Sequence, residues 1–141
     1  MDSKYLITGA GGFVGSALLP VLGRRVSVVI GTCAHHGVRS YNLRINRSTD
    51  FTDCLENIDC VIHLAARVHV MNDGDVDLLQ AYRDVNVEGT LNLARQAAAA
   101  RVRRFVFVSS IKVNGENTNG RPLFNECDAP NPLDAYGISK L

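Results

Sequence analysis

Residues 8–15 read TGAGGFVG, and three of these glycines, Gly9, Gly12 and Gly15, form a G-x-x-G-x-x-G spacing between an apolar run and a helix-patterned segment. Gly9 would allow a sharp turn, Gly12 would let the backbone approach a pyrophosphate, and Gly15 would let a helix pack closely on a strand. Free N–H groups at the start of that helix would face the phosphates. An ordinary glycine-rich turn is the alternative, but the spacing and position predict a dinucleotide-binding turn.

The rest of the chain alternates short apolar runs, rich in β-branched residues, with segments of helical spacing. We expect strands over residues 5–8, 26–30, 41–45, 60–66 and 105–110, and helices over residues 13–22 and 78–100. The long helix is expected to bury one stripe, formed by Leu78, Tyr82, Val85, Leu91, Ala94 and Ala98. Such alternation predicts an α/β fold whose parallel strands are covered on both faces and bind ligands at their carboxyl ends, where TGAGGFVG lies.

Composition predicts one globular domain over residues 1–141 and argues against several other classes. Fifteen basic and 14 acidic side chains give a net charge of +1 and are mixed along the chain, which argues against a nucleic-acid partner. No apolar run approaches the roughly 18 residues of a membrane span, and the first residues lack the form of a signal peptide, so we expect a cytoplasmic protein. The four cysteines form no C-x-x-C pair and are expected to be reduced thiols. His63 and His69 lie six apart, which does not suit a zinc site.

The end of the second strand bears on the choice of cofactor. An acidic residue there would hold the ribose of NAD, and a basic one would favour NADP. Here the strand runs into Gly31, Thr32 and Cys33, so the expected acid is missing. Arg24 or Arg39 is a candidate for a 2′-phosphate, and the cofactor is therefore NAD or NADP.

A second group of residues points to chemistry. The last strand-like run ends in Ser109 and Ser110, and further along Tyr136 and Lys140 lie four apart, on one face of a helix. A nearby ammonium and an oxidised nicotinamide would both favour a phenolate, which could take a proton from a sugar hydroxyl as hydride leaves. Ser110 would hold the same oxygen by a hydrogen bond. A surface tyrosine and a solvated lysine are the alternative.

Five motifs in order resemble one family. TGAGGFVG, HLAA at residues 63–66, NVEGT at 86–90, VSSIKVNGE at 108–116 and YGISK at 136–140 are similar to the extended short-chain dehydrogenases/reductases that act on nucleotide sugars. The resemblance implies a Rossmann-type, doubly wound parallel sheet. It also implies the catalytic residues Ser110, Tyr136 and Lys140. The cofactor-binding residues it implies are Gly9, Gly12, Phe13, Val14, Gly15, Leu64, Ala65, Ala66, Asn86, Tyr136 and Lys140. A helix-surface role is the alternative for Asn86.

Some positions depart from the family's pattern. Arg44 and Ile45 stand where a Gly-Asp pair often precedes the adenine contact, and Asn114 stands where many epimerases have tyrosine. Dehydratases place an Asp-Glu pair directly after the catalytic serine, whereas this chain has Ile111 and Lys112. The resemblance therefore favours 4-epimerisation or 4-keto reduction of a UDP-sugar in polysaccharide synthesis over dehydration.

The chain ends at Leu141, one residue after Lys140, where the family continues into a substrate domain. We therefore expect an N-terminal fragment without nucleotide-sugar turnover, prone to homodimerisation or other self-association through uncovered edges. An isolated six-residue helix is far below the stable length, so the Tyr136–Lys140 geometry is not expected to be held. A non-catalytic dinucleotide-binding or sensor domain is the second hypothesis.

Overall fold

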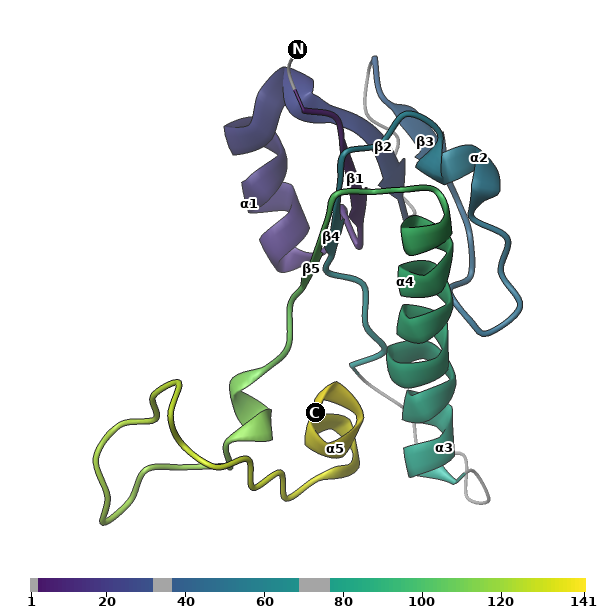
Figure 1. The fold of residues 1–141 in the computed structure, drawn as a ribbon. Helices are drawn as coiled ribbons and strands as arrows, with labels where there is room; N and C mark the ends of the chain where they lie inside the picture. The colour runs from purple at the N-terminus through teal and green to yellow at the C-terminus, as the bar shows by residue number, and fades with distance from the viewer. Residues whose placement is uncertain (1–2, 32–36, 69–76) are drawn as a thin grey trace.

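The computed structural model describes residues 3–31, 37–68 and 77–141. Its five strands are all parallel and lie in the order β3-β2-β1-β4-β5 (Figure 1). The strands are β1 Tyr5–Thr8, β2 Val26–Ile30, β3 Arg39–Tyr41, β4 Cys60–His63 and β5 Arg104–Phe107. The strand order reverses direction between β1 and β4, which creates a crevice at their carboxyl ends. The predicted α/β, Rossmann-type sheet is confirmed.

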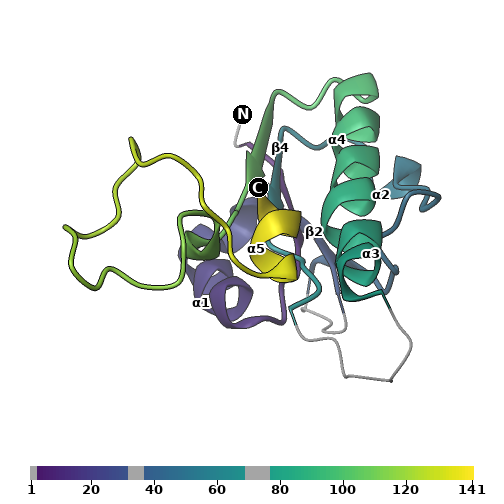
Figure 2. The same cartoon turned by 90° about the horizontal axis from the view of Figure 1, so that it is seen from below.

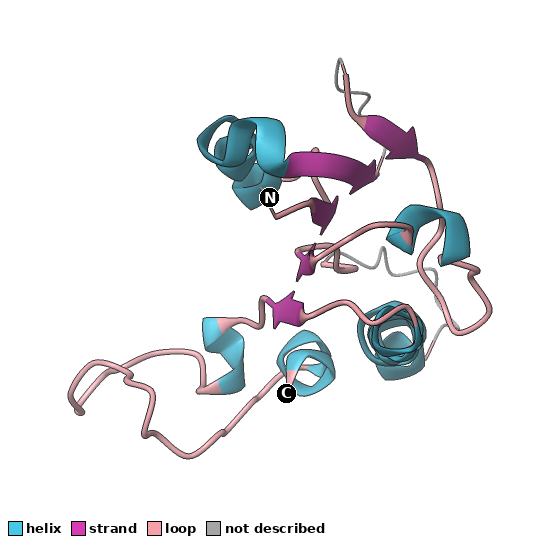
Figure 3. Cartoon of the chain, turned by 45° about the horizontal axis from the view of Figure 1, so that its top comes forward, coloured by secondary structure: helices cyan, strands magenta, loops and turns pink. Residues whose placement is uncertain are grey.

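Helices cover both faces of the sheet. Figure 3 shows α1 on one side and α4 on the other. The helical elements are α1 Phe13–Leu22, η1 Gly23–Arg25, α2 Thr52–Leu55, α3 Leu78–Arg83, the π-helical turn η2 Asp84–Gly89, α4 Thr90–Ala99, η3 Ile111–Val113 and α5 Ala135–Lys140. Successive residues of β1 pack into two hydrophobic clusters on opposite faces of the sheet. Leu6 belongs to the cluster with Phe51 and Leu93. Ile7 belongs to the cluster with Val29, against which Leu19 and Leu22 of α1 pack. This two-residue alternation buries β1 on both faces.

The later strands differ from the sequence prediction. β3 lies at Arg39–Tyr41 rather than residues 41–45, and β4 and β5 end earlier than expected. β5 is not covered on both faces, because Val106 and Phe107 are each 38% exposed. β5 is one of the two edge strands of this sheet, so a neighbouring strand pairs with only one of its sides, although its apolar run predicted an interior strand.

The predicted buried stripe of the long helix is wrong in its second half. Leu91 is 43% exposed and Ala98 is exposed, whereas Leu93 and Ala97 are buried. Leucines at both 91 and 93, followed by a run of alanines, do not specify which face of the helix is apolar. Leu78, at the helix start, is also 38% exposed.

One local and one tertiary feature set the rotation of α4. The π-helical turn Asp84–Gly89 separates α3 from α4, and such turns shift the side chains that follow. Asn92 and Gln96 both donate to the Thr49 carbonyl oxygen at 2.8 Å, which attaches α4 to the loop after β3. These contacts favour one of the two apolar faces that the sequence allows.

The glycine turn between β1 and α1 is packed too tightly for side chains at two positions. Gly9 has a φ of +68°, and a Cβ there would lie 2.7 Å from the Ala65 amide nitrogen. A Cβ at Gly15 would lie 2.6 Å from the Ala10 carbonyl oxygen. At Gly12, by contrast, φ is −76°, and a Cβ would meet one close atom, the Gly9 carbonyl oxygen, at 3.2 Å. Backbone packing therefore requires glycine at positions 9 and 15 more than at 12.

His63, at the end of β4, is the centre of a buried polar chain. One ring nitrogen lies 2.6 Å from the Thr8 hydroxyl and the other 2.9 Å from the Thr90 hydroxyl. The Thr8 hydroxyl also accepts the Ala65 amide at 3.1 Å. Burial, and then the charge of Lys140, lower the pKa of His63 to about 4. His63 is therefore a neutral structural residue, with both ring nitrogens used inside the protein.

Cys54, Cys60 and Cys127 are free thiols. Thr32, Cys33 and His69 lie outside the described residues. Within the described ranges, none of the helices is long and apolar enough to cross a membrane.

Replacing Gly15 with alanine should lower the free energy of unfolding by about 2 kcal/mol, because the added methyl meets the backbone of Ala10. Gly12→Ala is the matched control and should cost only about 0.5 kcal/mol, as expected for this change at a helix N-cap. Urea unfolding of the two variants and the wild type measures both values. Equal losses would contradict the packing difference described above.

Acid should destabilise the fold through His63. The pKa of His63 is 6.5 in the unfolded chain and about 4 in the folded protein, so between these pH values only the unfolded chain binds a proton at His63. The free energy of unfolding should therefore fall as the pH drops from 6.5 to 4, by up to about 3 kcal/mol. Urea unfolding at pH 7.5, 5.5 and 4.5 tests this, and His63→Gln should show a smaller fall. An equally steep fall in the variant would rule out His63 as the source.

Candidate functional site

A cavity of about 380 Å³ lies at the carboxyl ends of β1 and β4. In Figure 1 α5 lies beyond these strand ends, near α3, and Figure 2, which is seen from below, shows it between α1 and α3. Four segments form its walls: the glycine turn, the residues after β4, the residues after β5, and α5. The lining residues are Gly9, Gly12, Phe13, Val14, Gly15, Leu64, Ala65, Ala66, Val68, Val108, Ser109, Tyr136 and Lys140.

The structure thus brings together all but two of the site residues predicted from the sequence. Ser110 and Asn86 are not among the lining residues. Three lining residues, Val68, Val108 and Ser109, were not singled out as site residues by the sequence analysis. Their positions directly after β4 and β5 were the available signal, because residues at the carboxyl ends of parallel strands line the crevice of such a sheet.

The glycine-turn wall combines free backbone donors with exposed apolar side chains. The first hydrogen bond of α1 joins the Ser16 amide to the Gly12 carbonyl at 2.9 Å, so the amides before Ser16 have no partner within the helix. Phe13 is 95% exposed and Val14 is 51% exposed. A helix start with free amides favours an anion, and the neighbouring apolar side chains favour the flat surface of a ring.

Lys140 supplies a buried positive charge on the opposite wall. Lys140 is only 2% exposed, and burial lowers the pKa of its ammonium to about 8. The ammonium nitrogen lies 4.2 Å from the centre of the Phe107 ring. Across the described ranges no carboxylate forms an ion pair with it. A buried ammonium without an anionic partner is costly, so this group fits a ligand with polar oxygens in the cavity.

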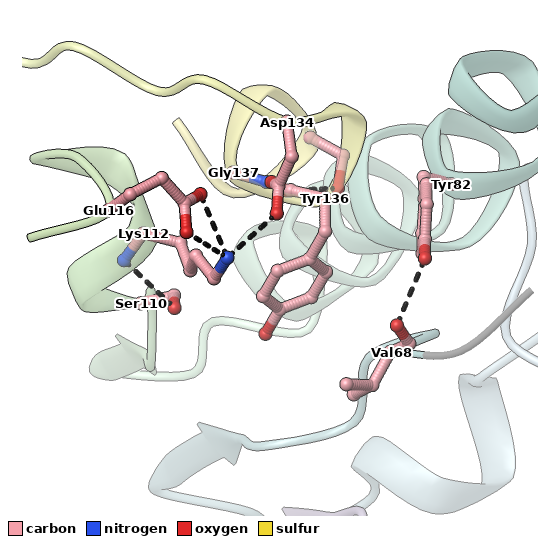
Figure 4. Close-up of polar contacts among 9 residues, drawn as sticks. Val68, Tyr82, Ser110, Lys112, Glu116, Asp134, Tyr136 and Gly137 are labelled. Atoms are coloured by element: carbon pink, nitrogen blue, oxygen red, sulfur yellow. Dashed lines mark hydrogen bonds and ion pairs between the residues drawn. The ribbon is translucent and has the colours of Figure 1, made fainter.

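Tyr136 lies one helical turn before Lys140 and lines the same cavity. Its ring packs edge-on against Tyr82, with ring centres 5.9 Å apart. The Tyr82 hydroxyl in turn donates to the Val68 carbonyl oxygen at 3.0 Å. In Figure 4 the Tyr136 ring extends toward the side on which Ser110 lies. The predicted pairing of Tyr136 and Lys140 on one helix face is thus present in the structure.

Contrary to the sequence expectation, the structure holds the short helix α5 in place at both ends. At its start, the Asp134 carboxylate accepts the Gly137 amide at 2.6 Å. At its end, the Ser109 hydroxyl donates to the Lys140 carbonyl oxygen at 2.8 Å. A local cap at one end and a tertiary hydrogen bond at the other together replace the length that an isolated helix would need.

Asn86 makes a third attachment to α5 from the π-helical turn. Its side-chain amide donates to the Ser139 hydroxyl at 2.9 Å and to the Arg67 carbonyl oxygen at 3.0 Å. Its side-chain oxygen accepts the Arg67 amide at 2.8 Å. Asn86 is 3% exposed, so the helix-surface alternative is wrong. It joins the loop after β4 to the helix that carries Tyr136.

The two serines after β5 have different roles. Ser109 lines the cavity and uses its hydroxyl to hold α5. Ser110 caps the turn Ile111–Val113, where its side-chain oxygen accepts the Lys112 amide at 3.3 Å. The described residues contain no hydrogen bond between Ser110 and Tyr136.

The arginines considered for a 2′-phosphate lie elsewhere. Arg39 donates to the carbonyl oxygens of Asp53 and Glu56, at 3.3 and 3.0 Å, and is thereby attached to α2. Arg24 lies in the turn Gly23–Arg25, which leads into the start of β2, at the opposite end of the strand from the cavity. Neither arginine lines the cavity.

Comparisons with known proteins agree with this geometry. Residues 5–141 match the model of the NAD dependent epimerase/dehydratase family. The chain is 42% identical to a UDP-glucose 4-epimerase of Vibrio cholerae, over 99% of its own length and 44% of that protein. The chain thus spans less than half the length of this relative.

Solved structures give the same result. MoeE5, in complex with UDP-glucuronic acid and NAD, is 32% identical with a TM-score of 0.78, over 98% of this chain and 46% of that one. A UDP-glucuronic acid 4-epimerase from Bacillus cereus, in complex with NAD, is 28% identical with a TM-score of 0.77, over 97% of this chain and 48% of that one. The chain therefore belongs to the NAD dependent epimerase/dehydratase family.

Proposed function

We propose that these 141 residues are the NAD(P)-binding part of a longer nucleotide-sugar enzyme that works by hydride transfer at C4 of a UDP-sugar. The observation that carries the proposal is that the glycine turn, Tyr136 and Lys140 all line the same cavity. The relatives agree, since they include a UDP-glucose 4-epimerase and proteins solved in complex with UDP-sugars and NAD. The remaining half of the enzyme would supply the sugar-binding pocket.

The residues present fit a dinucleotide. Gly9 and Gly15 are closely packed against backbone atoms, whereas Gly12 is the least crowded of the three glycines. A pyrophosphate could approach the free amides of α1 at Gly12. The buried ammonium of Lys140 would hydrogen-bond ribose hydroxyls on the opposite wall. We propose NAD rather than NADP, because Arg39 is attached to α2 and the related structures contain NAD.

The bound nicotinamide would accept or return the hydride. The Tyr136 side-chain oxygen would take the proton of the C4 hydroxyl while the C4–H electron pair leaves as hydride to the nicotinamide, so that the alcohol becomes a ketone. The pKa of Lys140, about 8, leaves its ammonium mostly protonated at neutral pH, one helical turn from Tyr136. Ser110 would donate a hydrogen bond to the same substrate oxygen. Returning hydride and proton to the ketone completes either an epimerisation or a reduction.

Epimerisation is the favoured outcome, because the Vibrio cholerae relative is described as a UDP-glucose 4-epimerase. A non-catalytic binding domain is the second candidate, although it would have no need for a tyrosine and a buried lysine in one cavity. An assay of the longer protein with UDP-glucose, UDP-N-acetylglucosamine and a UDP-4-keto-6-deoxy-hexosamine separates them. An epimerase interconverts sugars without net consumption of NADH, a reductase consumes NAD(P)H, and a binding domain does neither.

Self-association is also proposed. The edge strand β5 exposes Val106 and Phe107, and uncovered edges of this kind pair with other chains unless a further segment covers them. A longer chain could cover this edge itself, and sedimentation of the 141-residue and longer proteins would distinguish the two arrangements.

Gly12→Val should weaken NAD binding at least about tenfold, because the side chain enters the path proposed for the pyrophosphate. Calorimetric titration of the longer protein measures the affinity. Ala98→Val, at an exposed position of α4, is the control and should bind NAD as the wild type does. An unchanged affinity in Gly12→Val would show that the dinucleotide does not approach this turn.

Tyr136→Phe should keep NAD binding but lower turnover by about 10² or more, because it removes only the ionisable oxygen. Tyr82→Phe is the matched control, since its ring packs on Tyr136 and its hydroxyl serves a backbone carbonyl. Its turnover should fall much less. Wild-type turnover by Tyr136→Phe would exclude Tyr136 as the proton acceptor.

A further inference from the structure

An exposed lysine joins the segment after Ser110 to the start of α5. The Lys112 ammonium lies 2.6 and 2.8 Å from the two carboxylate oxygens of Glu116 and 3.0 Å from Asp134 (Figure 4). Lys112 belongs to the turn Ile111–Val113, which follows Ser110 directly, and Asp134 caps α5. A single side chain thus connects the strand end that carries Ser110 with the helix that carries Tyr136.

The hydrogen-bonding capacity of Lys112 is fully used by these contacts. An ammonium has three donors, and three carboxylate oxygens lie within 3.0 Å of it. It therefore has no donor left for a substrate or cofactor. Lys112 holds both Glu116 and Asp134, and of these two Asp134 caps the helix that carries Tyr136.

Asp134 uses both of its oxygens. One accepts the Gly137 amide and so caps α5, and the other receives Lys112. The Gly137 amide, and then Lys112, lower the pKa of Asp134, while hydrogen bonds to Glu116 and Asp134 raise the pKa of Lys112. The cap and its cation therefore remain charged over the whole neutral range.

The backbones meet at the same place. A Cβ on Gly137 would lie 2.8 Å from the Lys112 carbonyl oxygen, so only glycine allows this approach of helix and turn. The Asn131 amide donates to the Val113 carbonyl oxygen at 2.9 Å and closes the intervening loop onto the turn. The contact between the turn and α5 therefore has both a backbone and an ionic component.

We propose that Lys112 is a positioning residue that holds α5, and with it Tyr136 and Lys140, against the strand end that carries Ser110. The proposal rests on the proposed function of this site. The side chains of the three ionic partners are 35–41% exposed, and pairs this exposed contribute little to stability. Catalysis is far more sensitive, because a small misplacement of reacting groups can lower the rate by orders of magnitude.

The test compares variants of the longer protein with UDP-glucose as substrate. Lys112→Met should lower kcat about tenfold, with KM and NAD affinity within about twofold of wild type and an unchanged urea midpoint. Lys112→Arg can still bridge the two carboxylates and should restore most of kcat. Arg121→Met removes another ion pair of the same connecting segment, Arg121–Asp128 at 2.6 Å, and should leave kcat unchanged.

Hydrogen exchange of the α5 amides gives a second readout that does not depend on turnover. Exchange at Gly137 and the residues after it should be faster in Lys112→Met than in the wild type or in Arg121→Met. Asp134→Asn keeps an oxygen for the cap but loses the charge, so it should resemble Lys112→Met. The double variant should be no worse than either single one.

The outcomes separate this inference from the proposed function. If the wild type turns over and both Lys112→Met and Asp134→Asn retain its kcat and its α5 exchange rates, the positioning role is wrong. An equal fall of kcat in Arg121→Met would also overturn it. If the wild type has no turnover, the proposed function fails, and the exchange rates alone decide whether Lys112 holds α5. Should Lys112→Met not fold, Asp134→Asn decides in its place.

Discussion

The cavity depends on how closely the β1–α1 turn approaches the end of β4. Gly9 lies against the backbone of Ala65, and Gly15 lies against the turn itself, at distances that leave no room for a Cβ. This contact brings the start of α1 to the place where the strand order reverses, so that its free amides face the same space as the residues after β4. Val108, Ser109, Tyr136 and Lys140 line the remaining sides of the same cavity.

Buried polar side chains then fix the walls relative to one another. His63 joins β1 to the start of α4 through Thr8 and Thr90, and Asn86 joins the π-helical turn just before α4 to the loop after β4 and to α5. These groups are satisfied within the protein, whereas the ammonium of Lys140 is not paired with any carboxylate that the structure describes. The contrast distinguishes side chains that build the site from the Lys140 ammonium, which fits a ligand.

Much of the first half of the fold could be predicted because its signals are local. The bounds of β1, α1 and β2 agree with the sequence pattern, since a glycine turn between an apolar run and a helical stripe has few other solutions. The strand expected at residues 41–45 lies at Arg39–Tyr41, and the buried face of α4 was predicted wrongly. In α4 the choice between Leu91 and Leu93 depends on Asn92, Gln96 and the π-helical turn, whose partners lie far away in the sequence.

The sequence by itself determined that a glycine turn follows the first strand and that Tyr136 and Lys140 share one helix face, because both depend on spacing within a few residues. Only the tertiary structure decided that α5 is held, that Ser109 anchors it and that Asn86 is buried beneath it. Asn86 and Ser139 are 53 positions apart, and a hydrogen bond across that separation has no periodic signal. The hydrogen bond forms because the fold packs α5 against the π-helical turn that carries Asn86.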